Sequence, residues 1–332
     1  MAVTYISWAP HCSRSDYTAR ELSGTSHMVY VARLGSRPAT VWLKYLIQAF
    51  RTWKILLRRR HDAVFVMSPP VLAGLVVLPY CWFWRVPFVV DAHTGAFVDP
   101  RWRHFQWLQR WLCRKAATTI VTNTHLAEML ASYGADATIL PDVPVRYPES
   151  AALPPTTTDT TRFRIATICS FDYDEPVELI IDTARALPEV EFLVTGDPEK
   201  VERLRPQFPS NLTLTGFLDN ASYGRLLSDA HIVMALTTGQ HKMLRAAYEA
   251  VYQGTPIIIS DSPLLREEFD QGGFVVRNTV DDIVRAVRAL QQDLQKYRQQ
   301  VQALKDRKEG RWRQNKQLLL AKIEHARGVR AA

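Results

Sequence analysis

The chain has 332 residues, 47% of them hydrophobic and 22% charged, which is typical of a folded globular protein and excludes a disordered one. This length exceeds one ordinary hydrophobic core and predicts two domains. The four cysteines form no CxxC pair, which argues against a zinc site or a disulfide framework and favours a reducing cytosol. The first thirty residues contain no apolar secretory-signal run, so we expect a cytoplasmic protein.

The formal net charge is +8, and the whole excess lies in the N-terminal part. Residues 1–141 contain 16 Lys/Arg and 7 Asp/Glu, whereas residues 142–332 contain 25 and 26. Eight of the nine tryptophans also lie within residues 1–141. Basic charge combined with tryptophan favours an anionic membrane surface, with nucleic acid as the competing interpretation. Because no nucleic-acid-binding motif accompanies the charge, we expect a membrane partner and no nucleic acid.

Short apolar runs alternate with helical patterns in the first part of the chain. The runs that predict buried parallel strands are residues 3–8, 27–32, 63–67, 87–91 and 118–122. Helical spacing marks residues 39–59 and 100–116. The longest apolar stretch, residues 71–84, is shorter than the roughly 20 residues that a membrane-spanning helix needs, so it predicts a buried helix.

A segment with five prolines and a threonine-rich run, residues 141–161, interrupts this pattern and predicts a linker. The alternation then resumes, with strands predicted at residues 164–169, 191–195, 212–215, 231–235 and 256–260. The helices predicted between these strands cover residues 177–187, 198–206, 219–228 and 242–253, and a charged helical region follows from Val280.

This βα alternation indicates an α/β protein with two doubly wound, Rossmann-like domains that face a central cleft. We expect an N-terminal acceptor-binding domain at residues 1–141, a linker at 142–161 and a C-terminal nucleotide-sugar-binding domain at 162–305. A final helical segment, residues 306–332, is expected to pack back on the first domain. Ligands of such sheets bind beyond the carboxyl ends of the strands.

One strand end carries the residue types that a nucleotide diphosphate needs. The segment 237–243 follows a predicted strand and is expected to open a helix, whose unpaired N–H groups and dipole suit phosphate. Lys242 and Arg245 add positive charge. Glu249 lies eight residues after His241, so one helix would place both on the same face. A carboxylate at that position can accept hydrogen bonds from both ribose hydroxyls. Further candidate donor-binding residues are Ser170, Phe217, Thr238 and Met243.

Several stretches resemble glycosyltransferase family 4. EFLVTGDP at residues 191–198, the stretch 211–235 and the stretch 241–261 resemble its donor domain in order and spacing. VVDAHTGAF at residues 89–97 and the stretch 118–124 look like its acceptor domain. The resemblance implies a GT-B glycosyltransferase with a nucleotide-diphosphate sugar as co-substrate and neither a metal ion nor another cofactor.

The resemblance also implies roles for individual residues. Glu249 matches the family's ribose-binding glutamate, and His93 matches a histidine near the donor sugar, where it can orient the sugar or act as general base. We expect a retaining hexosyl transfer; if the reaction inverts instead, Asp91 is the better candidate base. The residues after the first strand are candidate acceptor or phosphate contacts: Ser13, Arg14 and Asp16.

Three departures indicate a divergent subgroup of the family. His241 stands where the family usually has a first glutamate, the loop 169–176 is acidic where an arginine and a lysine are usual, and the loop 10–16 is not glycine-rich. Two alternatives therefore stay open. The chain can be a catalytically inactive GT-B subunit that docks a transferase complex on the membrane, or a nucleotide-sugar 2-epimerase.

Two amphipathic stretches predict how the N-terminal domain meets an anionic membrane. In residues 41–60, an ideal helix separates an apolar face from a basic edge; the apolar face is Trp42, Leu46, Phe50, Trp53 and Leu57. In residues 100–115, one face is expected to bury Phe105, Leu108 and Leu112, and the other to expose Arg103, Trp107, Arg110 and Arg114. We therefore expect a peripheral protein on the inner face of the cell membrane, with a lipid-linked or glycolipid acceptor in cell-surface polysaccharide synthesis.

Overall fold

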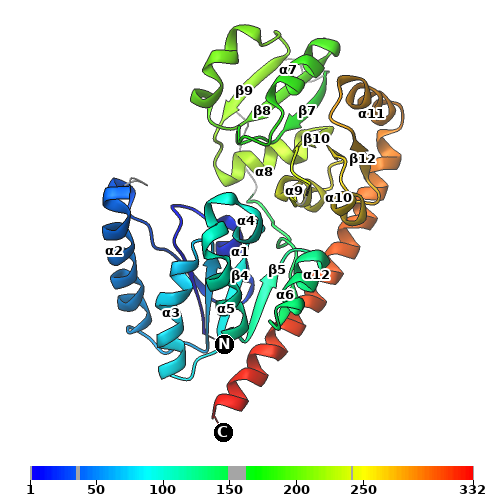
Figure 1. Cartoon of the computed structure of the whole chain (residues 1–332). Helices are drawn as coiled ribbons and strands as arrows, with labels where there is room; N and C mark the ends of the chain where they lie inside the picture. Colours follow the sequence, from blue (N-terminus) through cyan, green and yellow to red (C-terminus); the bar gives the residue numbers. More distant parts are fainter. Residues whose placement is uncertain (1, 35–37, 149–161, 241, 332) are drawn as a thin grey trace. The chain divides into compact units, whose positions relative to one another are not determined.

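The computed structural model describes residues 2–34, 38–148, 162–240 and 242–331. The chain folds into two compact units, each with its own sheet and core (Figure 1). Unit 1 contains Met1–Val143 together with Arg311–Ala332, and unit 2 contains Pro144–Gly310. Most of the expected linker, residues 149–161, lies outside the described residues. Within the described part of the chain, no helix combines the length and apolarity needed to cross a membrane.

Unit 1 is built on a six-stranded parallel sheet. Its strands are β1 (Val3–Ser7), β2 (Thr25–Met28), β3 (Ala63–Ser68), β4 (Phe88–Ala92), β5 (Thr118–Val121) and β6 (Ala137–Ile139). They lie in the order β2-β1-β3-β4-β5-β6. All residues of β1, β3 and β4 are buried, which explains why these strands read as continuous apolar runs rather than alternating ones.

Helices cover both faces of this sheet (Figure 1). They are α1 (Ser13–Glu21), η1 (Ala32–Leu34), α2 (Pro38–Leu56), α3 (Val71–Phe83), α4 (Gly95–Val98), η2 (Pro100–Phe105), α5 (Gln106–Lys115) and α6 (Thr124–Ser132). Side chains of α2, α3, α5 and α6 share one core with alternate strand residues. The opposite face is covered by α1 and by the end of the long helix α12 (Leu294–Ala331), which contributes Trp312, Leu319 and Ile323.

Unit 2 has a second six-stranded parallel sheet. Its strands are β7 (Phe163–Thr167), β8 (Val190–Thr195), β9 (Leu212–Gly216), β10 (Ile232–Ala235), β11 (Ile257–Ser260) and β12 (Gly273–Val276), in the order β12-β11-β10-β7-β8-β9. The helices are α7 (Val177–Ala186), η3 (Pro198–Gln207), α8 (Asn220–Asp229), α9 (Arg245–Gln253), α10 (Pro263–Glu268) and α11 (Val280–Gln292). α7 and α11 pack on one face of the sheet, and α8, α9, α10 and the start of α12 pack on the other.

The structure differs from the sequence-based elements in a few places. The strand expected at residues 27–32 ends at Met28, and η1 follows. The helix expected at 100–116 is two elements, because Asp99 and Pro100 begin a short 3-10 helix before α5. The helix expected to open within 237–243 begins only at Arg245, since Leu244 is extended. The two strands that the sequence does not predict, β6 and β12, are short edge strands.

Candidate functional site

The candidate donor site lies at the carboxyl edge of the sheet in unit 2. β7 and β10 are neighbours there, and the chain runs outward from them in opposite directions, which makes this the topological switch point of the sheet. The loop after β7 meets the loop after β10: the Thr238 N–H donates to the main-chain oxygen of Asp174 at 2.7 Å. Two loops that approach at a switch point create the concave edge where α/β sheets bind ligands.

Asp174 is the central acceptor of this edge. Lys242 Nζ lies 2.7 and 2.8 Å from its two carboxylate oxygens, and Thr237 Oγ1 donates to Oδ2. Burial disfavours the carboxylate, but the hydrogen bonds from Lys242 and Thr237 outweigh it and lower the pKa of Asp174. The cation that sequence analysis assigned to phosphate is therefore already paired with an anion of the chain itself.

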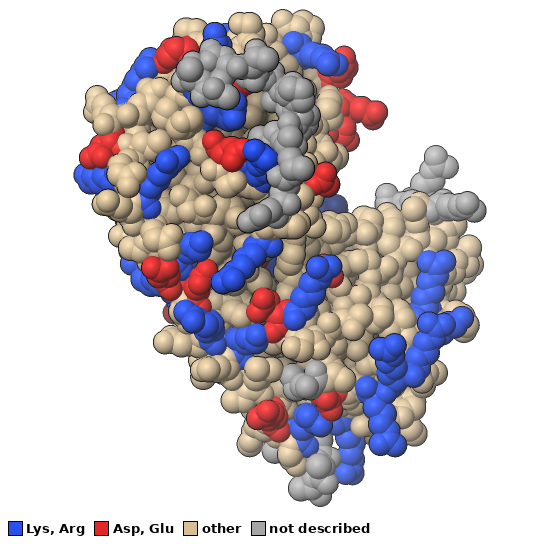
Figure 2. Space-filling model, turned by 180° about the vertical axis from the view of Figure 1, so that it is seen from behind, with Lys and Arg blue, Asp and Glu red and all other residues tan. Residues whose placement is uncertain are grey.

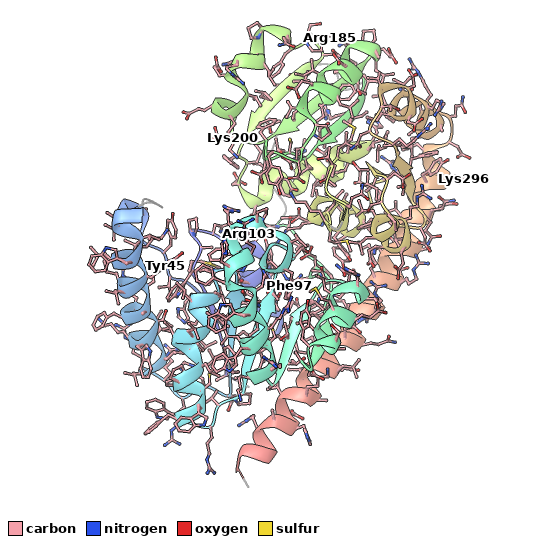
Figure 3. All side chains as sticks on the ribbon, viewed as in Figure 1. Tyr45, Phe97, Arg103, Arg185, Lys200 and Lys296 are labelled. Carbon is pink, nitrogen blue, oxygen red and sulfur yellow. The ribbon has the colours of Figure 1, made fainter. Side chains whose placement is uncertain are left out.

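Glu175 closes the acidic loop on itself. Its Oε2 accepts hydrogen bonds from the N–H groups of Ser170 and Asp172, at 2.8 and 2.9 Å, and from Cys169 Sγ. Burial and the neighbouring carboxylate of Glu175 raise the pKa of the Cys169 thiol. Lys200 of η3, labelled in Figure 3, donates to the main-chain oxygen of Ser170 at 2.8 Å. The N–H groups of this loop thus surround a carboxylate, as they would surround a bound anion.

Gly196, which follows β8, lets this loop pack closely. Its φ is +117°, and a Cβ there would meet the main-chain oxygen of Cys169 and the ring of Phe171 at 2.7 Å. Phe171 itself has a φ of 55°, which is uncommon for a residue with a side chain. The glycine of the sequence motif is therefore required by the shape of the acidic loop.

Arg245 and Glu249 form the second charged pair of the donor edge. Arg245 Nε lies 2.7 Å from Glu249 Oε1, and the Tyr223 hydroxyl of α8 donates to Oε2 at 2.8 Å. Glu249 is 7% exposed, so this carboxylate is held in place rather than solvated. His241 precedes α9, which corrects the expectation that one helix face carries it together with Glu249; its own placement lies outside the described residues.

The other expected donor contacts differ in exposure. Phe217 is 79% exposed, so it is no part of the core and is open to a flat ligand. Ser170 and Thr238 are exposed at the same edge, whereas Met243 is partly buried against the core of unit 2. Asp174, Glu175 and Tyr223 belong to the site but were not predicted to hold it together. The only feature of the sequence that could have indicated Asp174 and Glu175 is the acidic loop that follows a predicted strand.

In unit 1, Asp91 lies at the end of β4 in a buried network. It is 1% exposed, accepts a hydrogen bond from the Tyr5 hydroxyl, and pairs with Arg14 Nε at 3.3 Å. Arg14 also binds Asp142 at 2.9 Å and the main-chain oxygen of Leu140. Two expectations need correction here. Arg14 is 8% exposed with its donors engaged inside the unit, and Asp91 is too buried and too well paired to remove a proton from an acceptor.

His93 is the accessible member of this group. Its Nε2 lies 3.8 Å from Asp91 Oδ2 and 4.0 Å from Cys12 Sγ, and its side chain is 33% exposed. Burial disfavours the imidazolium, but the contact with Cys12 and the charge of Asp91 outweigh it and raise the pKa of His93. Conversely, the contacts with His93 and Ser15 overcome burial and lower the pKa of Cys12. A raised pKa means that a larger fraction of His93 carries the imidazolium form, in which both ring nitrogens are hydrogen-bond donors.

The remaining expected residues begin helix α1. Ser13 is half-buried at its first position, and Asp16 accepts a hydrogen bond from Ser26 Oγ at 2.6 Å and pairs with Arg20 at 2.8 Å. Cys12, which precedes them and contacts His93, was not predicted to belong to the site. In the described part of the chain, no three His, Cys, Asp or Glu side chains gather as metal ligands.

A second surface of unit 1 exposes large apolar side chains. On α2, Trp42, Leu46 and Phe50 are 58%, 59% and 71% exposed. Tyr45, labelled in Figure 3, lies on the other side of that helix and stacks on the buried Trp8. On α5, Trp107 is 68% exposed beside three exposed arginines, whereas Phe105 is 40% exposed and not buried as expected. Apolar surface of this extent on one unit is typical of an interaction site.

Family models match both parts of the chain. Residues 7–141 match a glycosyl transferase 4-like domain, and residues 162–293 match the glycosyl transferases group 1 domain. No curated protein sequence matches the chain.

Solved structures match over nearly the whole length. HepE from Anabaena, solved with UDP and glucose, is 13% identical, with a TM-score of 0.70 over 98% of this chain and 100% of that one. Sucrose-phosphate synthase from Thermosynechococcus elongatus is 13% identical, with a TM-score of 0.66 over 97% and 100%. A Listeria monocytogenes protein described as a UDP-N-acetylglucosamine 2-epimerase is 12% identical, with a TM-score of 0.62 over 91% of each chain. Likeness at this identity establishes the fold.

Proposed function

Because the chain belongs to the glycosyltransferases of the GT-B fold that are similar to family 4, we propose that it transfers a hexose from a nucleotide-diphosphate sugar to a membrane-associated saccharide. The acceptor in this proposal is a lipid-linked sugar or a glycolipid used in cell-surface polysaccharide synthesis. The protein works as a peripheral protein on the inner face of the cell membrane. UDP and UDP-glucose are the first ligands to test, since HepE was solved with both.

One observation carries the donor half of the proposal: Lys242, Arg245 and Glu249 gather at the switch point of the sheet in unit 2. Lys242 and Arg245 offer positive charge to a pyrophosphate, and the N-terminus of the nine-residue helix α9 adds the positive end of the helix dipole. Glu249 offers lone pairs to the ribose hydroxyls, and exposed Phe217 offers a face for the nucleobase. Positive groups of this kind can stabilise a leaving diphosphate without a metal ion.

The reacting-centre residue in this proposal is His93. Its raised pKa and partial exposure suit a hydrogen-bond donor to the transferred sugar or to the leaving phosphate. Asp91 lies 3.8 Å from His93 and acts as a positioning residue, and Tyr5 and Arg14 in turn hold Asp91 in place. The reaction retains anomeric configuration, with the leaving phosphate as the group that accepts the proton of the acceptor hydroxyl. The anomeric signal of the product in NMR, with and without EDTA, tests retention and metal independence.

The acceptor half rests on the exposed apolar and basic surface of unit 1. Trp42, Leu46 and Phe50 on α2, and Trp107 among the arginines of α5, are side-chain types that suit the headgroup region of a membrane. A membrane-bound acceptor would then be met at the surface on which the enzyme docks. Sedimentation with neutral and anionic vesicles tests this part of the proposal.

The deciding experiment is calorimetric titration of UDP and UDP-glucose into the wild type, Lys242→Ala and Glu249→Ala. Loss of a charged hydrogen-bond partner typically costs about 1.5–3 kcal/mol, so we expect each variant to bind about 10–100 times more weakly. Lys296→Ala on α12 is the matched control, because Lys296 is exposed and outside this edge. Wild-type affinity in both site variants overturns the donor site. Product formation without any acceptor favours the epimerase instead.

A further inference from the structure

A cavity of about 550 Å³ opens on unit 1 beside the end of α2. Its wall is formed by Leu56, the last residue of α2, with residues 57–61 after it, and by Tyr80, Trp84 and Val86 from the end of α3 and beyond. Three consecutive arginines, Arg58 to Arg60, contribute to this wall, and no aspartate or glutamate does. The cavity is separate in sequence and in sheet position from His93 and from the donor edge of unit 2.

The three arginines differ from the more buried ones in their surroundings. Arg58, Arg59 and Arg60 are exposed, and in the described part of the chain no carboxylate pairs with their guanidinium groups. This contrasts with Arg14 and Arg245, whose charges are neutralised by neighbouring carboxylates. Figure 2 shows basic side chains gathered without acidic ones on the side of unit 1 that carries α2. Unpaired arginines around a cavity favour an anion with several oxygens, such as a phosphate.

The neutral part of the wall is held rigidly. His61 Nε2 donates to the Leu56 main-chain oxygen at 3.0 Å, and His61 Nδ1 forms a hydrogen bond with Thr4 Oγ1 at 2.6 Å. Burial and the nearby charge of Arg59 lower the pKa of His61, so it adds no further cation. The ring of Trp84 stacks on Tyr80, with centroids 4.6 Å apart. The cavity is therefore shaped by packed side chains, while its charge comes from the arginines.

Leu57 in the cavity wall and two residues that precede Trp84 in the chain expose large apolar side chains. Leu57 is 58% exposed, and Phe83, whose ring contacts Trp84, is 70% exposed. Trp82 beside it is 79% exposed. Leu57 also continues the apolar stripe of α2 that runs through Leu46 and Phe50. An anion site bordered by bulky apolar side chains matches a molecule whose phosphate is attached to hydrocarbon, rather than a free anion in water.

From this geometry we propose that the cavity binds the phosphate of an anionic phospholipid of the bilayer, while Leu57, Trp82 and Phe83 enter the interface around it. Arg58, Arg59 and Arg60 hold the phosphate oxygens, and Trp84 lies at the level of the headgroup. This site adds a specific lipid contact to the surface of unit 1 that docks on the membrane in the proposed function. The biological purpose of this lipid contact rests on the proposed function. The lipid binding itself does not, because it needs neither the sugar donor nor the acceptor.

The test uses the full chain and a soluble lipid, so that it isolates the cavity from general attraction to a charged surface. Dihexanoylphosphatidylglycerol is titrated as monomers, with dihexanoylphosphatidylcholine as the neutral lipid. The cavity variant is R58Q/R59Q/R60Q, and the charge-matched comparison is R203Q/R205Q/R298Q, which alters three exposed arginines of unit 2 outside both proposed sites. We expect the wild type and the comparison variant to bind the anionic lipid alike, and the cavity variant to bind at least about tenfold more weakly.

A second measurement uses vesicles of phosphatidylcholine alone and of an equimolar mixture with phosphatidylglycerol. Wild type should prefer the mixed vesicles, and the cavity variant should lose on the order of 100-fold in partitioning, since each basic residue near the surface contributes about fivefold. Circular dichroism melting checks that the variant folds; if it does not, the three single Arg→Gln variants replace it.

Several outcomes would overturn the cavity proposal. They are absence of monomeric lipid binding, equal binding of the neutral lipid, equal losses in both triple variants, and competition by single-stranded RNA as strong as that by the lipid. Titration of UDP-glucose into the same variants keeps the two proposals apart. If the cavity variant keeps its UDP-glucose affinity but loses lipid binding, the cavity proposal is supported. If the wild type does not bind UDP-glucose, only the proposed function is contradicted.

Discussion

At the scale of single residues, charge compensation decides what each candidate can do. Arg14 and Asp91 look like ligand contacts in the sequence, but in the structure they pair with each other and with Asp142 inside unit 1. His93 stays accessible beside them. A buried pair of opposite charges holds its neighbours in position, whereas removing one partner leaves an uncompensated charge. The proposed role at the reacting centre is therefore assigned to His93, whose side chain stays partly exposed, and not to the buried pair.

The first residue-scale prediction concerns the pKa of His93. We expect NMR titration to place it above the ordinary value of 6.5, and Cys12→Ala to lower it, because the contact with Cys12 supports the imidazolium. Cys81→Ala makes the same change on α3 and should leave the His93 pKa unchanged. A His93 pKa below 6.5 in the wild type would contradict the assignment of a hydrogen-bond donor.

The same shift fixes the sign of a stability effect. A folded pKa above the unfolded value means that the contribution of His93 to the free energy of unfolding is fully present below about pH 6.5. That contribution is lost as the pH rises through the folded pKa. The difference in free energy of unfolding between wild type and His93→Ala should therefore shrink from pH 6 towards pH 8, as measured by urea denaturation.

At the scale of elements, the loop after β7 and the loop after β10 act together. Asp174 binds Lys242 and Thr237 through its side chain and Thr238 through its main chain. The acidic loop after β7 is thus hydrogen-bonded to the loop after β10. A basic loop at this place would not form these bonds and would leave Lys242 available to a phosphate. In the proposed function, an anionic donor therefore competes with this carboxylate for Lys242.

We therefore predict that Asp174→Asn strengthens UDP binding, by up to about tenfold, because the charge of Lys242 is no longer neutralised. Asp182→Asn removes an exposed carboxylate of the same unit, which pairs with Arg185, and serves as the control. Isothermal titration measures both. Weaker UDP binding by Asp174→Asn, with an unchanged melting temperature, would show that the carboxylate assists the donor instead of competing with it.

At the scale of the whole molecule, the last helix is divided between the two units. Residues 294–310 of α12 belong to unit 2 and residues from Arg311 belong to unit 1. Its second part adds Trp312, Leu319 and Ile323 to the core of unit 1. Lys322 also binds Asp136 and the main-chain oxygen of Ala137 beside β6. A segment remote in sequence thus completes the core of the N-terminal unit.

Deletion of residues 311–332 should therefore destabilise unit 1 while unit 2 keeps its protection. The deletion removes three large apolar side chains from the core of unit 1. Burial of each such side chain typically contributes roughly 1.5–3 kcal/mol to the free energy of unfolding. Hydrogen exchange with mass spectrometry reports the two units separately in the same sample. The substitutions Gln302→Ala and Gln314→Ala, at exposed positions of α12, should leave exchange in both units unaltered. Equal loss of protection in both units would contradict this assignment.

The sequence by itself determined the succession of strands and helices in both units, the apolar stripe of α2 and the basic character of the first part of the chain. These are local properties, because the period of apolar residues and the local balance of charge are fixed along the chain. The positions of Phe217 and Glu249 at the carboxyl edge of a sheet follow from the same pattern.

Only the tertiary structure decided which charges remain available to a ligand. Asp174 and Lys242 are 68 positions apart, and Arg14 and Asp91 are 77 apart, so no local pattern pairs them. Likewise, α9 begins at Arg245 and not within residues 237–243, where Thr237, Thr238 and Lys242 bond to Asp174 from the loop after β7. The physical reason is that the stability of a charge depends on the groups folded around it, and these come from distant parts of the chain. Folding therefore pairs Arg14, Lys242 and Arg245 with carboxylates, so the diphosphate of the proposed donor has to compete for Lys242 and Arg245. In the part of the chain that the structure describes, no carboxylate pairs with Arg58, Arg59 or Arg60.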